Sequence, residues 1–202
     1  MTAAPVPPVP GSAARPTSGS AAQPTGARPG PDAGPVIDPA EVHALLRARG
    51  ETVAVAESLT GGLLAAALTD TPGASATFRG GLVVYATDLK AKLAGVPAPL
   101  LQAQGAVSPD VAAALAGGVR DRLGATYGLG LTGVAGPDAQ DGVPVGTVYL
   151  GLAAPQGGQV HKLELAGDRA AVRAAAVAAA LALLATGIAA TEVSGAGRES
   201  SR

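Results

Sequence analysis

Three short segments of the 202-residue chain carry hydroxyl, amine and glycine residues at spacings that could support chemistry. The first, AESLTGG at 56–62, places Ser58 between an expected strand and an expected helix, where α/β proteins usually bind their ligands. A serine hydroxyl there can act as a nucleophile if a base removes its proton. Gly61 and Gly62 would let a ligand or another backbone come close. The alternative is that Ser58 or Thr60 only caps the helix, as Ser and Thr commonly do.

The second segment, YATDLKAK at 85–92, could supply the base. Lys90 falls in the first turn of an expected helix, where the field of the helix N-terminus disfavours a cation. Such a field would help to lower the pKa of the lysine, as a general base requires. Tyr85, at the expected end of the preceding strand, could orient the amine or relay its proton. In the alternative interpretation the segment holds two ordinary solvated lysines, and Lys92 is expected to be one in either case.

The third segment, LTGVAGP at 131–137, is a glycine-bearing loop that leaves another expected strand. Loops of this type can form nests of backbone N–H groups that bind anions. The same residues could equally form a connection with ordinary turn chemistry and no ligand.

The composition narrows the chemistry that these segments can perform. The chain has no Cys, and its two His residues, His43 and His161, lie far apart in the sequence. Thiol nucleophiles, zinc–thiolate sites and an HExxH metal motif are therefore excluded. With 14 Lys and Arg against 15 Asp and Glu, and with four aromatic residues, neither a basic surface nor a stacking platform for nucleic acid is expected. The carboxylates are scattered, so no metal site is predicted.

The periodicity of the sequence predicts the scaffold that would position these segments. Asp38-Pro39, Ser108-Pro109 and Asp168 carry the cap and proline signals of helix starts. Strands are predicted at 52–56, 81–85, 127–132, 146–153 and 159–165, and helices at 39–49, 60–69, from 88, from 109 and at 169–185. Strands that alternate with helices and then end in a hairpin predict an α/β single domain with a mixed β-sheet of about five strands and flanking helices.

Two patterns in the chain resemble a dinucleotide-binding motif and a membrane span, but another interpretation is favoured for each. GLGLTG at 128–133 matches the dinucleotide fingerprint G-x-G-x-x-G, but its glycines lie inside an expected strand and Pro137 follows in place of a helix. A Rossmann site is therefore not expected. The run at 174–190 is apolar but short and dominated by Ala, so a helix packed on the sheet is favoured over a membrane span.

The ends of the chain differ in composition from its middle. Nine of the 17 prolines lie in the first 35 residues, which have little apolar surface to bury. Residues 1–35 are predicted to be a disordered extension, 36–188 the folded domain and 189–202 a disordered tail. The extension lacks the basic and apolar regions of a secretory signal, and we expect a cytoplasmic protein.

Five segments in order resemble one family. They are AESLTGG (56–62), GLVVYATDLKAKLAGV (81–96), GAVSPDVAAALAGGV (105–119), LTGVAGPDAQDGVPVGTVY (131–149) and LAGDRAAVRAAAV (165–177). Over about residues 40–186 the chain is similar to the CinA C-terminal domain, the nicotinamide-nucleotide amidase family. The resemblance implies an α/β domain that hydrolyses the carboxamide of nicotinamide mononucleotide to nicotinic acid mononucleotide and ammonia, in pyridine-nucleotide recycling.

The resemblance also assigns roles to single residues. It implies Ser58, Tyr85 and Lys90 as the catalytic residues. The substrate-binding residues that it implies, together with neighbouring glycines, are Leu59, Thr60, Gly61, Gly62, Thr132, Gly133, Gly136 and Arg169. Arg169 comes from the Gly-Asp-Arg sequence at 167–169, and it could instead support the helix. The resemblance implies no cofactor and no metal. It does imply a homo-oligomer.

The chain departs from the family pattern in three places. Leu59 stands at a position that is often Cys. The loop 138–143 is shorter than usual and lacks the charged residue commonly found before the proline, which bears on how this loop contacts a ligand. Many members carry a large N-terminal domain without a counterpart here, so no activity of that domain is inferred.

The mechanism expected from these residues is nucleophilic amide hydrolysis through an acyl-enzyme. Ser58 attacks the carboxamide carbon, a neutral Lys90 acts as base, and Tyr85 orients or relays the proton. Backbone N–H groups near Leu59 and Thr60 could stabilise the oxyanion or hold the 5′-phosphate. The partner is a small-molecule nucleotide, with neither nucleic acid nor membrane expected. The alternatives are a non-enzymatic pyridine-nucleotide-binding or regulatory module, and hydrolysis of a related pyridine nucleotide.

Overall fold

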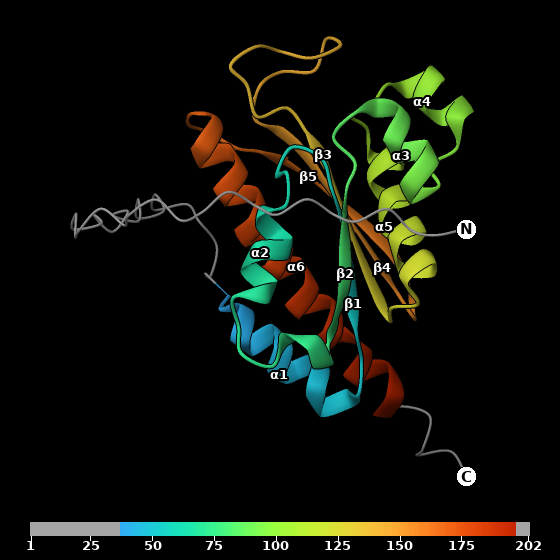
Figure 1. Cartoon of the computed structure of the whole chain (residues 1–202), viewed down its shortest axis with the longest axis vertical. Helices are drawn as coiled ribbons and strands as arrows, with labels where there is room; N and C mark the ends of the chain where they lie inside the picture. The colour runs from blue at the N-terminus through green and yellow to red at the C-terminus, as the bar shows by residue number, and fades with distance from the viewer. Residues whose placement is uncertain (1–36, 197–202) are drawn as a thin grey trace, which may run out of the picture.

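The computed structural model describes residues 37–196, with side chains for residues 37–190. The predicted extension at 1–35 lies outside the described residues, as do residues 197–202 of the predicted tail. The α/β fold with a mixed five-stranded sheet is confirmed (Figure 1).

The sheet has the strand order β2-β1-β3-β4-β5. Its strands are β1 (Val53–Glu57), β2 (Phe78–Val83), β3 (Tyr127–Gly133), β4 (Thr147–Ala154) and β5 (Gly157–Glu164). β1 pairs in parallel with both β2 and β3, whereas β3, β4 and β5 pair in antiparallel fashion. The carboxyl ends of β1, β2 and β3 therefore meet at one edge of the sheet, where the sequence motifs begin.

Helices cover both faces of the sheet (Figure 1). They are α1 (Pro39–Arg49), α2 (Leu63–Thr69), α3 (Thr87–Ala94), α4 (Ala98–Gln104), α5 (Pro109–Leu123) and α6 (Arg169–Ala196), with a short 3-10 helix at Ala74–Ala76. α1, α2 and α6 pack over one face, where their apolar side chains join those of β1, β3 and β4 in the larger core cluster. α3 and α5 pack on the other face in a second cluster.

The cap signals in the sequence form as predicted. Asp38 accepts a hydrogen bond from the Ala40 amide at 2.8 Å, and Ser108 accepts one from the Val111 amide at 3.3 Å. Asp168 accepts from the Ala171 amide at 2.8 Å at the start of α6. Each of these side chains satisfies an amide that the first turn of a helix leaves without a partner.

The glycines of the GLGLTG string lie inside β3, as we expected when we rejected the Rossmann interpretation. A Cβ atom at Gly130 would clash with the Ala112 carbonyl of α5, and one at Gly151 of the neighbouring β4 would clash with the same carbonyl. These glycines therefore let the backbone of α5 lie directly on the sheet rather than bind a dinucleotide.

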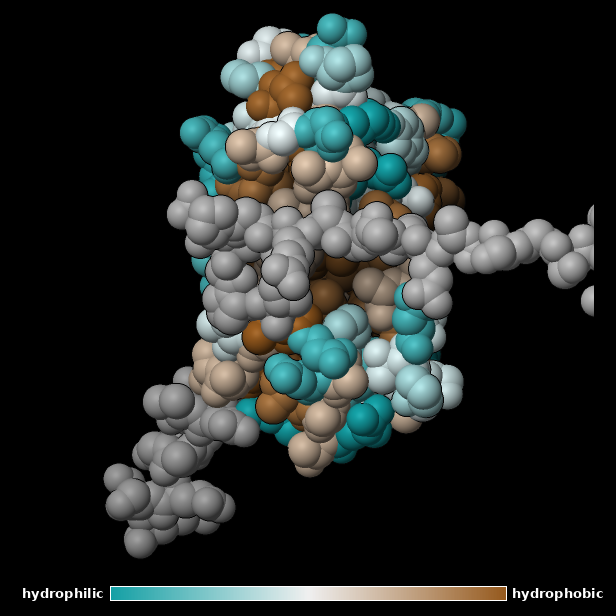
Figure 2. Space-filling model, turned by 90° about the vertical axis from the view of Figure 1, so that its left-hand side faces the viewer, coloured by the Kyte–Doolittle hydropathy of each residue, from teal (hydrophilic) through white to brown (hydrophobic). Residues whose placement is uncertain are grey.

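α6 packs on the sheet through a stripe of fully buried residues at helical spacing, which includes Val172, Ala176, Ala180, Leu184 and Ile188. Over Arg169–Ala190 this helix is also long and apolar enough, by length and composition, to cross a membrane. The buried stripe matches the predicted core helix. Seen from the side of α2 and α6, hydrophobic residues are visible at the middle of the molecule, with hydrophilic residues above and below them (Figure 2).

The predicted end of this helix near residue 185 and the tail boundary at 189 are wrong, because α6 continues to Ala196. The sequence places Gly187 where a helix could stop. In the structure a Cβ atom at Gly187 would clash with the Leu152 side chain. Glycine is therefore present for close packing on β4, and the next residue, Ile188, is fully buried.

Two other elements differ from the prediction. The second strand begins at Phe78 and ends at Val83, three and two residues before the predicted limits of 81 and 85. A Cβ atom at Gly81 would lie 2.8 Å from the Val55 side chain, so this glycine permits close pairing with β1. The short helix α4 was not predicted, and it begins beside Pro97 and Pro99 in the first positions of a helix, where proline is tolerated.

Candidate active site

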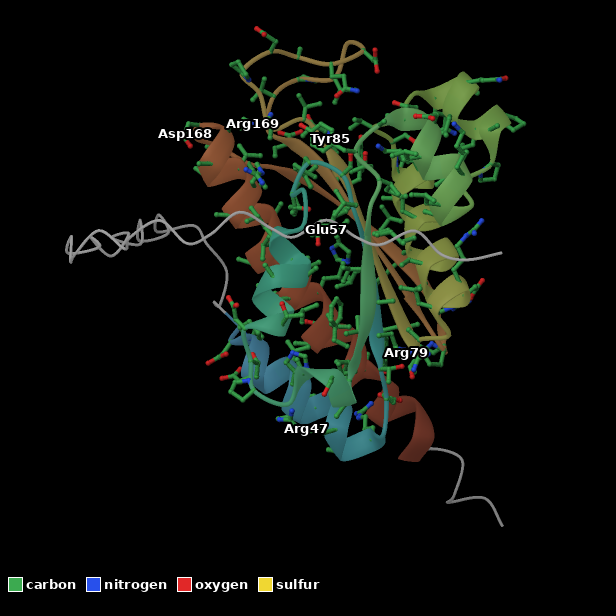
Figure 3. The ribbon with its side chains drawn as sticks, in the orientation of Figure 1. Arg47, Glu57, Arg79, Tyr85, Asp168 and Arg169 are labelled. Atoms are coloured by element: carbon green, nitrogen blue, oxygen red, sulfur yellow. The ribbon has the colours of Figure 1, made fainter. Side chains whose placement is uncertain are left out.

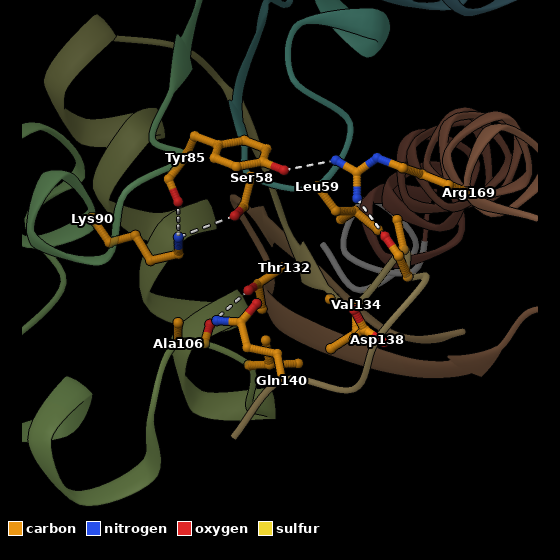
Figure 4. A pocket seen from close by; sticks show the side chains of 14 residues that line it. Ser58, Leu59, Tyr85, Lys90, Ala106, Thr132, Val134, Asp138, Gln140 and Arg169 are labelled. Atoms are coloured by element: carbon orange, nitrogen blue, oxygen red, sulfur yellow. Dashed lines mark hydrogen bonds between the residues drawn. The ribbon is translucent and has the colours of Figure 1, made fainter. Parts of the chain in front are cut away.

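A pocket opens at the carboxyl ends of β1 and β3, between the beginnings of α3 and α6 (Figure 4). It brings together residues from all three chemistry-bearing segments. The lining residues are Ser58, Leu59, Tyr85, Lys90, Ala106, Val107, Thr132, Gly133, Val134, Ala135, Gly136, Asp138, Gln140 and Arg169. Thr60, Gly61 and Gly62, which were also predicted to bind substrate, are not among them.

Ser58 follows β1 directly and is held by the sheet. Its amide donates to the Leu131 carbonyl at 3.1 Å, so the pairing between β1 and β3 extends one residue beyond the strand. The side chain is 9% exposed and contributes to the pocket wall. The hydroxyl is thus fixed at the edge where the sequence predicted a nucleophile.

Lys90 reaches Ser58 from the adjacent helix α3. Its Nζ lies 3.0 Å from Ser58 Oγ, 2.9 Å from the Val84 carbonyl oxygen and 3.4 Å from the Tyr85 carbonyl oxygen. In a neutral amine the two N–H groups can donate to the two carbonyls, which leaves the nitrogen lone pair for the serine proton. The arrangement therefore has the geometry of a serine and its general base.

Burial explains why this lysine can be neutral near physiological pH. The Lys90 residue is 1% exposed, and desolvation lowers the pKa of its amine from 10.5 to about 8. The sequence suggested the field of the helix N-terminus as the cause. The cause is burial, because no carboxylate within the described part of the chain pairs with the amine, and the charged form loses its hydration.

Tyr85 lies at the pocket but not in the predicted relay position. Its side chain is 56% exposed, and its hydroxyl accepts a hydrogen bond from Arg169 Nη2 at 2.7 Å. The contact between Tyr85 and Lys90 runs through the Tyr85 backbone carbonyl. The Tyr85 phenol and the Lys90 amine therefore point to different sides of the pocket (Figure 4).

Arg169 closes the side of the pocket formed by α6. Its Nη1 donates to the Gly136 carbonyl at 2.7 Å, and Nη2 donates to Tyr85. Figure 3 shows Tyr85 and Arg169 together at one end of the molecule. Among residues 37–190 no carboxylate pairs with this guanidinium, so its positive charge is available to an anionic ligand.

Thr132 and Gly133 end β3 on the opposite wall. Thr132 is buried, and its hydroxyl donates to the Ala106 carbonyl at 2.6 Å. This bond ties β3 to the segment before α5, and both residues line the pocket. Asp138 and Gln140 add exposed polar side chains from the loop that follows β3.

Neither histidine lines this pocket. His43 is fully buried, and its ring bonds the Leu68 carbonyl at 2.8 Å and the Thr77 hydroxyl, so it links α1 to α2. His161 is exposed on β5. No group of three or more His, Asp or Glu side chains in the described residues could hold a metal ion. Lys90 is therefore the basic group placed against Ser58.

Comparison with known proteins identifies the family. The family model for the CinA C-terminal domain matches residues 38–188, which is the whole of the folded region up to the end of the buried part of α6. The chain belongs to the CinA C-terminal domain family.

Individual relatives agree with this assignment. A CinA-like protein of Frankia casuarinae is 59% identical over 143 residues, which cover 71% of this chain and 33% of that protein. The chain spans about a third of the length of the curated relatives that it matches. A crystal structure of a CinA superfamily protein from Klebsiella pneumoniae 700603 has a TM-score of 0.72 and 33% identity, covering 75% of this chain and 95% of that one. One from Escherichia coli has a TM-score of 0.71, also at 33% identity, covering 73% and 87%.

This CinA C-terminal domain contains a charged residue whose role the sequence did not indicate. Glu57, 1% exposed, accepts hydrogen bonds from the amides of Gly62 at 2.9 Å, Leu64 at 3.1 Å and Ala65 at 2.8 Å. The first amides of α2 are therefore already occupied. These three amides are therefore not free to bind a phosphate, which leaves those of Leu59 and Thr60.

The two glycines of the same CinA motif shape this turn and do not line the pocket. Gly61 has φ +61°, and its Cα faces the Arg173 guanidinium, whereas Gly62 faces the Val83 side chain. The signal for Glu57 was present in the sequence, because a carboxylate at the end of an apolar buried strand must find hydrogen-bond donors. Identifying those donors required the position at which α2 begins.

Proposed function

We propose that the protein hydrolyses the carboxamide of nicotinamide mononucleotide to nicotinic acid mononucleotide and ammonia. The observation that carries the proposal is the 3.0 Å contact between Lys90 Nζ and Ser58 Oγ, made by a lysine whose pKa is lowered to about 8. Membership of the CinA C-terminal domain family, with the motif residues in the pocket, supports the same activity.

In the first half of the reaction, Ser58 Oγ attacks the carboxamide carbon while Lys90 takes the hydroxyl proton. The C–O bond forms, and the carbonyl electron pair moves to oxygen to give a tetrahedral oxyanion. Lys90 then gives the proton to the leaving nitrogen, the C–N bond breaks, and ammonia departs. In the second half a water loses its proton to Lys90 and attacks the acyl carbon. Lys90 then gives this proton to Ser58 Oγ as the C–O bond to serine breaks, which releases the acid and restores the serine hydroxyl.

The oxyanion needs donors, and the turn after Ser58 has two amides for this task. In the described residues no acceptor is bonded to the N–H groups of Leu59 and Thr60, although both residues are buried. The amide that follows a serine nucleophile is a common oxyanion donor. We assign the oxyanion role to these amides and the phosphate role to Arg169, whose guanidinium is not paired with a carboxylate in the described region.

Purified protein incubated with nicotinamide mononucleotide should release ammonia and nicotinic acid mononucleotide in equal amounts. Ser58→Ala and Lys90→Met should lower kcat by 10²-fold or more, because loss of a positioned base alone typically costs about 10²–10⁴-fold. Lys92→Met is the matched control, since Lys92 is an exposed neighbour paired with Asp88. Nucleotide binding by the wild type without ammonia release would reject the amidase and indicate a binding module. A panel of related pyridine nucleotides tests the substrate.

A further inference from the structure

Arg173 of α6 binds two backbone carbonyls of the turn that follows Ser58. Its Nε donates to the Leu59 carbonyl at 3.0 Å, and its Nη2 donates to the Thr60 carbonyl at 2.8 Å. Both partners lie more than 110 residues away in the sequence, and the contact is partly buried. A guanidinium is permanently charged and forked, so it can hold two carbonyls in a fixed relative position.

These two hydrogen bonds determine where the Thr60 and Gly61 amides point. In a trans peptide the C=O and the following N–H are directed to opposite sides. Because Arg173 holds the Leu59 carbonyl, the Thr60 N–H must point away from α6. The Gly61 amide donates to the Ser58 carbonyl at 3.1 Å, which closes the turn on the side of the nucleophile.

Glu57 fixes the same turn from its far end. Its carboxylate binds the amides of Gly62, Leu64 and Ala65, so Arg173 holds the carbonyls of the turn and Glu57 holds the amides that follow it. Between these anchors the amides of Leu59 and Thr60 are left without an acceptor in the described residues, at 4% and 0% exposure. Buried amides without a partner are rare and unfavourable. Here the hydrogen bonds from Arg173 to the Leu59 and Thr60 carbonyls hold the turn in the conformation that leaves these amides unpaired.

We propose that Arg173 is a positioning residue for the acyl-transfer reaction, which sets the Leu59–Thr60 turn so that its amides receive the oxyanion formed at Ser58. The inference rests on the proposed amidase function for its substrate. Arg173 does not line the pocket, so it acts through the backbone rather than by touching the substrate. This distinguishes it from Arg169, which lies four residues earlier on the same helix and does line the pocket.

A purely structural role makes a different prediction from a positioning role. If Arg173 only ties α6 to the turn, its removal lowers the melting temperature and leaves kcat per folded molecule unchanged. If it sets the oxyanion donors, its removal lowers kcat with KM little changed, because the lost interaction exists only in the transition state. Displacement of an oxyanion donor is expected to lower kcat on the order of 10²-fold.

The experiment compares Arg173→Ala and Arg173→Lys with the wild type in ammonia release from nicotinamide mononucleotide. A lysine ammonium is a point charge and holds two carbonyls less well than the forked guanidinium of arginine. The kcat of Arg173→Lys should therefore lie between those of Arg173→Ala and the wild type. Millimolar guanidinium should partly restore the kcat of the alanine variant. Arg79→Ala is the matched control, because Arg79 also donates to a distant backbone carbonyl, that of Leu123 at 3.0 Å, but at the opposite end of β2.

A second readout does not depend on the identity of the amide substrate. A fluorophosphonate reacts when Ser58 Oγ displaces fluoride from phosphorus and the hydroxyl proton leaves with it, through a transition state that also places negative charge on oxygen. The rate of this labelling should fall on the order of 10²-fold in Arg173→Ala and be unchanged in Arg79→Ala. Folded Arg173→Ala with wild-type kcat or wild-type labelling would overturn the proposal. Labelling of the wild type without ammonia release would instead reject the proposed substrate alone, and no labelling of the wild type would overturn both.

Discussion

The protonation of Lys90 gives a quantitative prediction for the pH dependence of the reaction. Ser58 can lose its proton to Lys90 only when the amine is neutral, so kcat/KM should follow the neutral fraction of this group. With a pKa of about 8, about a tenth of the amine is neutral at pH 7 and about nine tenths at pH 9. The expected result is a rise in kcat/KM of about tenfold between these pH values.

The same lowered pKa links Lys90 to folding. In the unfolded chain the amine titrates near 10.5, and in the folded protein near 8, so between these values the unfolded state binds more protons. The free energy of unfolding should therefore rise with pH from about 8 to 10.5 and, for this group, stay level below pH 8, where both states carry the protonated amine. The difference of about 2.5 between the two pKa values corresponds to about 3 kcal/mol.

Initial rates of ammonia release between pH 7 and 10 measure the first effect, in a range where the substrate phosphate has already ionised. Urea denaturation of wild type and Lys90→Met at each pH measures the second, because the variant lacks the titrating amine. Lys92→Met should reproduce the wild-type profiles in both assays, since its side chain is 67% exposed. A wild-type profile that is flat or falling from pH 7 to 9 would refute the general-base role. If the free energy of unfolding of the wild type changed with pH in the same way as that of Lys90→Met, the lowered pKa of Lys90 would be refuted.

Three further substitutions test the rest of the site and its scaffold. Glu57→Gln should lower the free energy of unfolding by about 1–3 kcal/mol in urea denaturation, because an amide NH₂ replaces one of the two oxygens that accept three amides; unchanged stability would contradict this cap. Arg169→Ala should raise KM for the mononucleotide about tenfold or more and leave that for nicotinamide riboside nearly unchanged, since the latter lacks the phosphate; equal effects on both would remove the phosphate role. Gly130→Ala should lower the melting temperature sharply by overpacking against α5, whereas Gly117→Ala, where a Cβ meets nothing within 4 Å, should not.

The meeting of Ser58 and Lys90 could be predicted because each follows one of two adjacent parallel strands, β1 and β2, whose carboxyl ends share an edge. The reason for the lysine's lowered pKa could not. It depends on the packing of α3 against the sheet, which buries the amine, and a sequence shows the helix but not the depth of a side chain within the fold.

The contacts of Tyr85 were not predicted, for a related reason. The strand was expected to end at this residue, but it ends at Val83, and the two-residue shift leaves the phenol 56% exposed and facing α6. The contacts of Arg173 were also outside the reach of the sequence, because they join segments more than 110 residues apart through backbone atoms that carry no sequence signal.

Helix α6 carries both arginines of the site, four residues apart, and this spacing has a consequence for how such domains can change length. Each residue turns a helix by about 100° and advances it by about 1.5 Å. One residue inserted between Arg169 and Arg173 would therefore swing Arg169 away from Tyr85 or Arg173 away from the turn. Insertions and deletions among homologues are expected in the loop 138–143, whose side chains are exposed or partly exposed, and not within residues 169–173.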